Sequence, residues 1–85
     1  MLIFMIKKLI YKSHYRGTKE GDFILSSFAK SSLANCSKDE IRMYSELLEY
    51  KDTEIHEWVL FPQNSPALLK PIILKIATFH GFTKF

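Results

Sequence analysis

The sequence predicts a single all-α domain over residues 1–85, a small bundle of about five helices joined by short connections. Three observations predict this fold class. Apolar residues recur at helical rather than alternating spacing along the chain. The chain contains only 3 glycines and 3 prolines, and 47% of its 85 residues are hydrophobic. This length and composition suit one ordered domain with a modest core.

The first helix is expected over residues 2–15. Its apolar residues Ile6, Leu9 and Ile10 recur at helical spacing, and His14 is a candidate for the same face. Gly17 is expected to end it, because glycine commonly follows the last helical residue. We expect residues 1–4 either to be disordered or to precede the true start at Met5.

The second helix is expected over residues 19–33, where several serines lower its intrinsic helix propensity. The third has a clearer boundary. Ser37 and Glu40 have the spacing of a capping box, which predicts a helix from about Lys38 to residue 49 or 50. Its core-facing positions share one stripe: Ile41, Tyr44 and Leu48, with Met43 and Leu47 beside it.

Asp52 is expected to cap a short fourth helix, because an aspartate side chain can accept a hydrogen bond from the first free backbone amides. Its core-facing residues are Ile55, Trp58 and Val59. Residues 61–66 then form a connecting loop. The fifth helix is expected from residue 66 or 67 to residue 80, and Pro71 fits it only in the first turn.

Composition and motifs exclude several classes of function. The single Cys36 excludes an internal disulfide and a multi-thiolate metal site. The three histidines are far apart, so we expect no metal site. Neither a glycine-rich phosphate loop nor a nucleophile elbow is present, so we expect no independent catalytic centre. No run of about 18 apolar residues occurs, so we expect no membrane insertion.

Charge is unevenly distributed along the chain, whose formal net charge is +3. Basic residues gather on the first helix and just after it: Lys7, Lys8, Lys12, Arg16 and Lys19. Acidic residues gather on the third and fourth: Glu40, Glu46, Glu49, Asp52, Glu54 and Glu57. A small basic nucleic-acid-binding or regulatory module is therefore an alternative function. It is disfavoured because the net charge is small and no base-reading helix is evident.

Residues 16–20, Arg-Gly-Thr-Lys-Glu, lie where the first helical pattern ends and the second begins. Arg16 and Glu20 have the spacing of an ion pair within one helix. Gly17 and Thr18 argue against that interpretation, because both are poor helix residues and indicate a turn. The arginine offers a planar fork of donors for a carboxylate or phosphate, and the glycine allows a partner to approach the backbone closely.

The residues around this segment make it more specific. Further residues that match the pattern of a known family lie before the segment, after it and downstream: Lys8 to Ser13, Asp22, Leu47, Leu48, Glu49, Asp52 and Trp58. In this frame, and in an R-G-x-x-E motif formed by Arg16, Gly17 and Glu20, the chain resembles the succinate dehydrogenase flavinylation and assembly factor family. The resemblance covers about residues 7–79. It implies a five-helix fold.

The resemblance also implies a function as an assembly factor rather than an enzyme. The partner would be the flavoprotein subunit of succinate dehydrogenase, or also that of fumarate reductase, in which FAD becomes covalently linked to a histidine. This chain would bind no cofactor stably, because the partner carries the FAD. The implied partner-binding residues are Arg16, Gly17 and Glu20, flanked by Tyr11, His14, Tyr15 and Asp22.

We further expect a monomer that binds no nucleic acid. A mitochondrial relative would need an amino-terminal targeting extension rich in Arg and Ser. The sequence in hand has no such extension, which favours a bacterial cytoplasmic location, with a processed mitochondrial form as the alternative.

Overall fold

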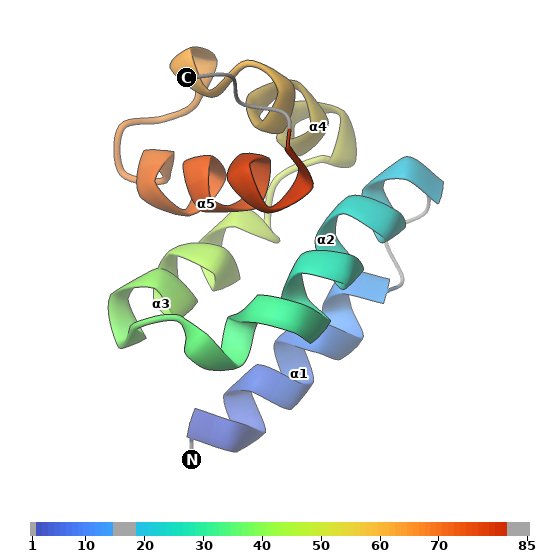
Figure 1. The fold of residues 1–85 in the computed structure, drawn as a ribbon, viewed down its shortest axis with the longest axis vertical. Coiled ribbons are helices and arrows are strands. Elements are labelled where there is room, and N and C mark those ends of the chain that lie inside the picture. The colour runs from blue at the N-terminus through green and yellow to red at the C-terminus, as the bar shows by residue number, and fades with distance from the viewer. Residues whose placement is uncertain (1, 15–18, 82–85) are drawn as a thin grey trace.

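The computed structural model describes residues 2–14 and 19–81, and the regular structure in these ranges is entirely helical (Figure 1). Its α-helices are α1 Leu2–His14, α2 Lys19–Ser32, α3 Lys38–Leu47, α4 Asp52–Leu60 and α5 Lys70–His80. Two 3-10 turns, Leu33–Asn35 and Pro62–Asn64, lie between them. The prediction of a small all-α domain with five helices is therefore confirmed.

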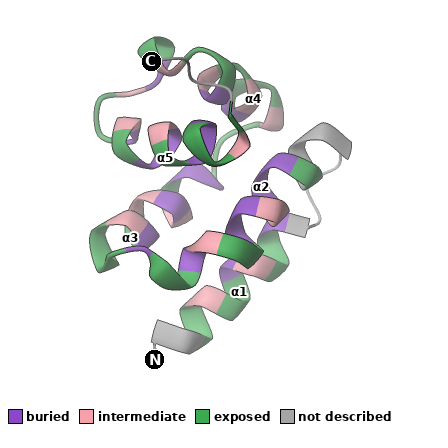
Figure 2. Cartoon of the chain, viewed as in Figure 1, coloured by how far each residue is buried: buried purple, intermediate pink, exposed green. Residues whose placement is uncertain are grey.

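Helices α1 and α2 form an antiparallel hairpin along one side of the molecule (Figure 1). Helix α5 packs across the bundle against α2, α3 and α4. The principal extents are 34 × 26 × 20 Å. Buried positions face the centre from every helix (Figure 2). The largest fully buried side chains include Leu25, Phe28, Tyr44, Ile72, Ile73 and Ile76.

Helix α1 has the predicted apolar face, with one polar addition. Leu9 is buried, and Ile6 and Ile10 pack against the core while half-buried. Ser13 is completely buried on the same face, which the sequence interpretation did not include. Residues 2–4 belong to α1, and the expectation about the true start of the chain stays a prediction.

Helix α3 begins as predicted. The Ser37 amide donates to Glu40 Oε1 at 2.8 Å, and the Glu40 amide donates to Ser37 Oγ at 3.1 Å, which forms a capping box. The helix ends at Leu47, two or three residues earlier than expected. The amides of Glu49 and Tyr50 bond to carbonyls three residues back, at 3.0 Å each, so the chain tightens into a turn.

Helix α4 corrects the predicted cap. Lys51 occupies the N-cap position with an extended backbone, and Asp52 is the first helical residue. The Lys51 carbonyl already accepts the first helical bond from the Ile55 amide at 3.0 Å. Glu54 Oε1 accepts from the Lys51 amide at 3.2 Å. Trp58 is half-buried rather than fully buried, and its ring packs edge-on against Tyr50 at 5.0 Å.

Helix α5 begins at Lys70, later than the predicted residue 66 or 67. Pro71 explains the difference, because it has no amide proton and its ring would clash with the carbonyl of Ala67 in a continuous helix. The preceding residues instead form tight turns, with the Leu69 amide bonded to the Pro66 carbonyl at 3.0 Å. Pro71 lies in the first turn, as expected.

Candidate functional site

The predicted partner-binding residues lie at one end of the α1–α2 hairpin. His14 is the last residue of α1, and Glu20 and Asp22 lie in the first turn of α2. The backbone of these three residues is described, and their side chains are not. A four-residue link can span at most about 18 Å between the two helices. The fold thus gathers residues from both helix ends at one place.

Three predicted residues fall in that link. Tyr15, Arg16 and Gly17 lie outside the residues that the structure describes. Their roles therefore stay predictions. Their neighbours fix where the link must begin and end, because His14 and Lys19 belong to the two packed helices.

Tyr11 is the predicted site residue whose side chain is described. It lies one turn before His14 on α1, and it is 66% exposed. Phe23 follows Asp22 on α2 and is 64% exposed. Sequence reasoning did not single out Phe23. The available signal was its position off the apolar side formed by its buried neighbours Ile24 and Leu25. Each helix of the hairpin therefore offers one exposed aromatic ring near the predicted motif.

A buried hydroxyl pair anchors the α1 half of this end. Ser13 Oγ lies 2.5 Å from Tyr44 Oη on α3 and 2.7 Å from the carbonyl of Leu9. Tyr44 Oη also lies 3.1 Å from the carbonyl of Leu25 on α2. The three contacts of these two hydroxyl groups join α1, α2 and α3. Because Ser13 directly precedes His14, this network holds the last turn of α1 against the core.

A second contact anchors the α2 half. His80 Nε2 lies 2.8 Å from the carbonyl of Ile24, so the end of α5 is tied to α2 one turn after Glu20. The His80 ring also packs against Phe23, with centroids 5.8 Å apart. Sequence reasoning did not foresee this bond. Its partner is 56 residues away and is a backbone group, which leaves no pattern in the sequence.

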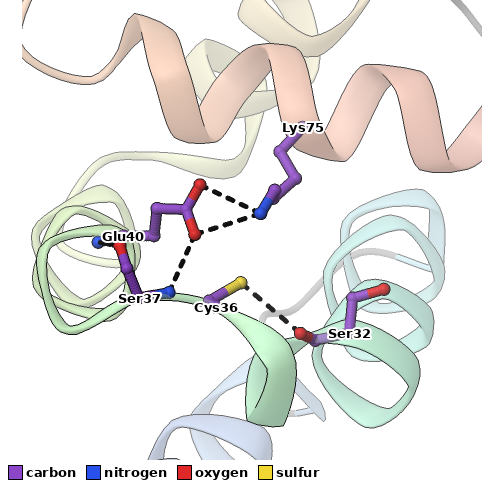
Figure 3. A network of polar contacts seen from close by, with 5 residues as sticks. All are labelled: Ser32, Cys36, Ser37, Glu40 and Lys75. Carbon is purple, nitrogen blue, oxygen red and sulfur yellow. Dashed lines mark hydrogen bonds and ion pairs between the residues drawn. The ribbon is translucent and has the colours of Figure 1, made fainter.

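A separate polar network joins α3 to α5 (Figure 3). Lys75 Nζ lies 2.9 Å from Glu40 Oε2 and 3.0 Å from Oε1. The hydrogen bond from the Ser37 amide, followed by that from Lys75, holds the pKa of Glu40 below its usual value. The hydrogen bond to Glu40 raises the pKa of Lys75. This network stabilises the bundle and contains none of the predicted site residues.

Cys36 lies beside that network and is buried. Burial raises the pKa of its thiol, and the nearby Lys75 ammonium opposes that effect. The thiol lies 3.4 Å from the carbonyl of Ser32. Such a thiol is a packing group rather than a nucleophile.

Two further features bear on function. Within residues 2–14 and 19–81, no group of three or more His, Cys, Asp or Glu is placed to hold a metal ion. In the same ranges, no helix combines the length and the apolar character that crossing a bilayer requires. The described residues also present the exposed rings of Tyr11 and Phe23 near one end of the hairpin.

Comparison with known proteins identifies relatives of this chain. Residues 7–80 match a family described as the flavinator of succinate dehydrogenase. Two similar proteins, both named succinate dehydrogenase assembly factor 2, mitochondrial, come from Dictyostelium discoideum and Cryptococcus neoformans. They are 34% identical over 74 residues and 37% identical over 71 residues, which covers 87% and 81% of this chain. No solved structure matches.

The relatives correct one prediction. The chain spans about half the length of the first relative, 52%, and 41% of the second. Both are eukaryotic proteins whose names place them in mitochondria, which contradicts the predicted bacterial cytoplasmic location. That prediction relied on a missing targeting extension. Relatives longer than the matched region have room for such a segment outside it, so its absence from these 85 residues carried no information about location.

Proposed function

Because this chain belongs to the family described as the flavinator of succinate dehydrogenase, we propose that it is an assembly factor for that enzyme. It binds the flavoprotein subunit and promotes the covalent attachment of FAD to a histidine of that subunit. The family match over residues 7–80 is the observation that carries this proposal. By the same match, the assembly-factor hypothesis is favoured over a nucleic-acid-binding module.

The location of the proposed contact is the end of the α1–α2 hairpin. Support comes from two contacts, since Ser13 bonds α1 to Tyr44 of α3 and His80 of α5 bonds to the Ile24 carbonyl of α2. An anchored surface loses less conformational entropy on binding than a mobile one. The exposed rings of Tyr11 and Phe23 add apolar area on either helix, and aromatic residues are enriched at protein interfaces.

Within this contact, Arg16 binds a carboxylate of the partner through its planar fork. Gly17 lets the partner surface approach the backbone, because it has no side chain. Glu20 orients the motif or a side chain of the partner. An acid or base role for Glu20 is less favoured, since the flavoprotein can supply most of the reacting groups itself.

The chemistry itself takes place on the partner. Attachment requires loss of a proton from the 8α-methyl group of the flavin, negative charge held on the ring and a histidine nitrogen placed for attack. The flavoprotein supplies these groups. This chain acts by holding the immature subunit so that flavin and histidine stay in a productive arrangement. It is therefore an assembly factor and not an enzyme. We place this activity in mitochondria, as for the named relatives.

The test is co-expression with the flavoprotein subunit of succinate dehydrogenase, followed by in-gel fluorescence of covalently bound flavin. We expect Gly17→Arg to abolish flavinylation and binding while the isolated protein keeps its helical circular dichroism and melting temperature. Ser31→Arg, which adds the same side chain at an exposed position of α2, is the matched control. Full partner binding by Gly17→Arg would overturn the assignment of the site. Flavinylation unaffected by removing the whole protein would overturn the function.

A further inference from the structure

The first turns of α1 expose apolar and cationic side chains together, and the proposed function does not use them. Phe4 is 78% exposed and Met5 is 48% exposed. Both line one surface hollow with Lys7 and Lys8. The family match begins at residue 7, so the two apolar residues lie outside the region that the family shares. The two lysines, in contrast, lie inside the matched region.

Charge is strongly polarised between this helix and α4. Helix α1 contains three lysines and no acidic residue. Among the residues that the structure describes, none of these ammonium groups pairs with a carboxylate. Helix α4 contains three acidic residues and neither lysine nor arginine. Helix α4 lies toward the end of the longest axis that is opposite the start of α1 (Figure 1). A negatively charged surface would therefore attract the α1 end and repel the other.

The shape of this end favours a flat partner. The first turns of α1 project beyond α2 and α3 at one end of the molecule (Figure 1). A planar surface can therefore touch the Phe4–Lys8 stretch without meeting the rest of the bundle. Amphipathic helices bind bilayers in this way, with phenylalanine at the acyl boundary and lysines at the headgroups.

We propose that the amino-terminal half of α1 is a peripheral docking surface for an anionic lipid bilayer. Phe4 and Met5 enter the interface, and Lys7 and Lys8 contact the lipid phosphates. This mode needs no spanning helix. It brings the proposed partner site near a membrane without using it, because the link between α1 and α2 follows the other end of α1.

The experiment is sedimentation of the full chain with vesicles of phosphatidylcholine, or of equal amounts of phosphatidylcholine and phosphatidylglycerol. We expect at least about tenfold stronger partitioning into the anionic vesicles at low salt, and loss of this preference at high salt. The double variant Lys7→Glu/Lys8→Glu should abolish it. Phe4→Ser, which changes no charge, should weaken it by about tenfold through lost apolar burial.

Two exposed residues elsewhere give matched controls. Lys38→Glu and Phe61→Ser make the same chemical changes at other exposed positions and should keep full partitioning. Equal loss in the controls, or no preference for anionic vesicles, would overturn the proposal. Flavinylation measured without vesicles separates the two functions, since Lys7→Glu/Lys8→Glu should retain it. Loss of flavinylation in that variant would assign this face to an acidic protein partner instead.

Discussion

The hydroxyl groups of Ser13 and Tyr44 lie 2.5 Å apart in the core, 31 residues apart in the sequence. Each also reaches a backbone carbonyl, that of Leu9 or Leu25. Ser13 donates to the Leu9 carbonyl and Tyr44 donates to the Leu25 carbonyl, so the hydroxyl pair links three helices. Buried hydroxyl groups need such partners, because an unpaired polar group is costly away from water. The last turn of α1 thus depends on a residue of α3.

The first prediction follows from this pair. Tyr44→Phe removes one hydroxyl and leaves Ser13 bonded to Leu9, so the free energy of unfolding should fall by about 1 kcal/mol. Ser13→Ala should cost a similar amount. In a double-mutant cycle by urea denaturation, the two changes should couple by about 0.5 to 1 kcal/mol. Thr53→Ala, which removes a hydroxyl at an exposed position, is the control. Strictly additive losses would show that the two hydroxyls do not interact.

The second prediction concerns acid stability. A carboxyl pKa held below its usual value of 4.5 stabilises the fold above that pH, and the benefit disappears as the pH falls through the lowered pKa. The raised pKa of Lys75 acts at the other extreme, so its contribution disappears only as the pH rises through a value above 10.5. The Glu40 pair should therefore stabilise the protein across the neutral range.

Glu40→Gln tests this sign. Glutamine can still accept the capping bond but carries no charge. The variant should be less stable than the parent at neutral pH, and the difference should shrink as the pH falls through the lowered pKa of Glu40. Urea denaturation over a series of pH values, from neutral into acid, measures it. Glu46→Gln, at an exposed position of the same helix, should change stability little. A difference that persists or grows in acid would contradict the assignment.

The third prediction concerns the buried thiol. Burial raises the pKa of Cys36, so little thiolate is present near neutral pH and access is restricted. Its reaction with a disulfide reagent at about pH 8 should be at least tenfold slower than that of a free thiol peptide. Denaturation in urea should restore the full rate. A fast reaction in the folded protein would show that this thiol is exposed in solution and would reopen the question of a reactive role.

Local features of the fold were predictable from the sequence. The capping box of Ser37 and Glu40 was predicted correctly because both partners lie within one turn. The Asp52 cap was wrong because Lys51 and Asp52 are adjacent, and only the backbone angles decide which residue lies outside the helix. The predicted start of α5 at residue 66 or 67 was wrong because Pro71 cannot occupy the second turn of a helix. The helix begins at Lys70 instead.

Long-range polar contacts were not predictable. Tyr44 was expected on the apolar stripe, and its ring is there, but the partners of its hydroxyl are set by how three helices pack. Ser13 breaks the apolar pattern of its helix and gives no sign of being buried. The candidate site was predicted through a motif and a family resemblance. Periodicity alone gave only a helix boundary near Gly17.

The final prediction distinguishes the geometry of Arg16 from its charge. If its planar fork binds a carboxylate of the flavoprotein through two parallel bonds, Arg16→Lys keeps the charge but loses this geometry. Flavinylation with Arg16→Lys should then fall by about tenfold, which is most of the loss that we expect for Arg16→Ala. Covalent flavin fluorescence and partner pull-down measure both variants. Arg42→Lys is the control, since Arg42 is exposed and forms a local ion pair with Asp39 at 2.8 Å. Full activity of Arg16→Lys alongside an inactive Arg16→Ala would mean that positive charge suffices, and the two-bond contact would be wrong.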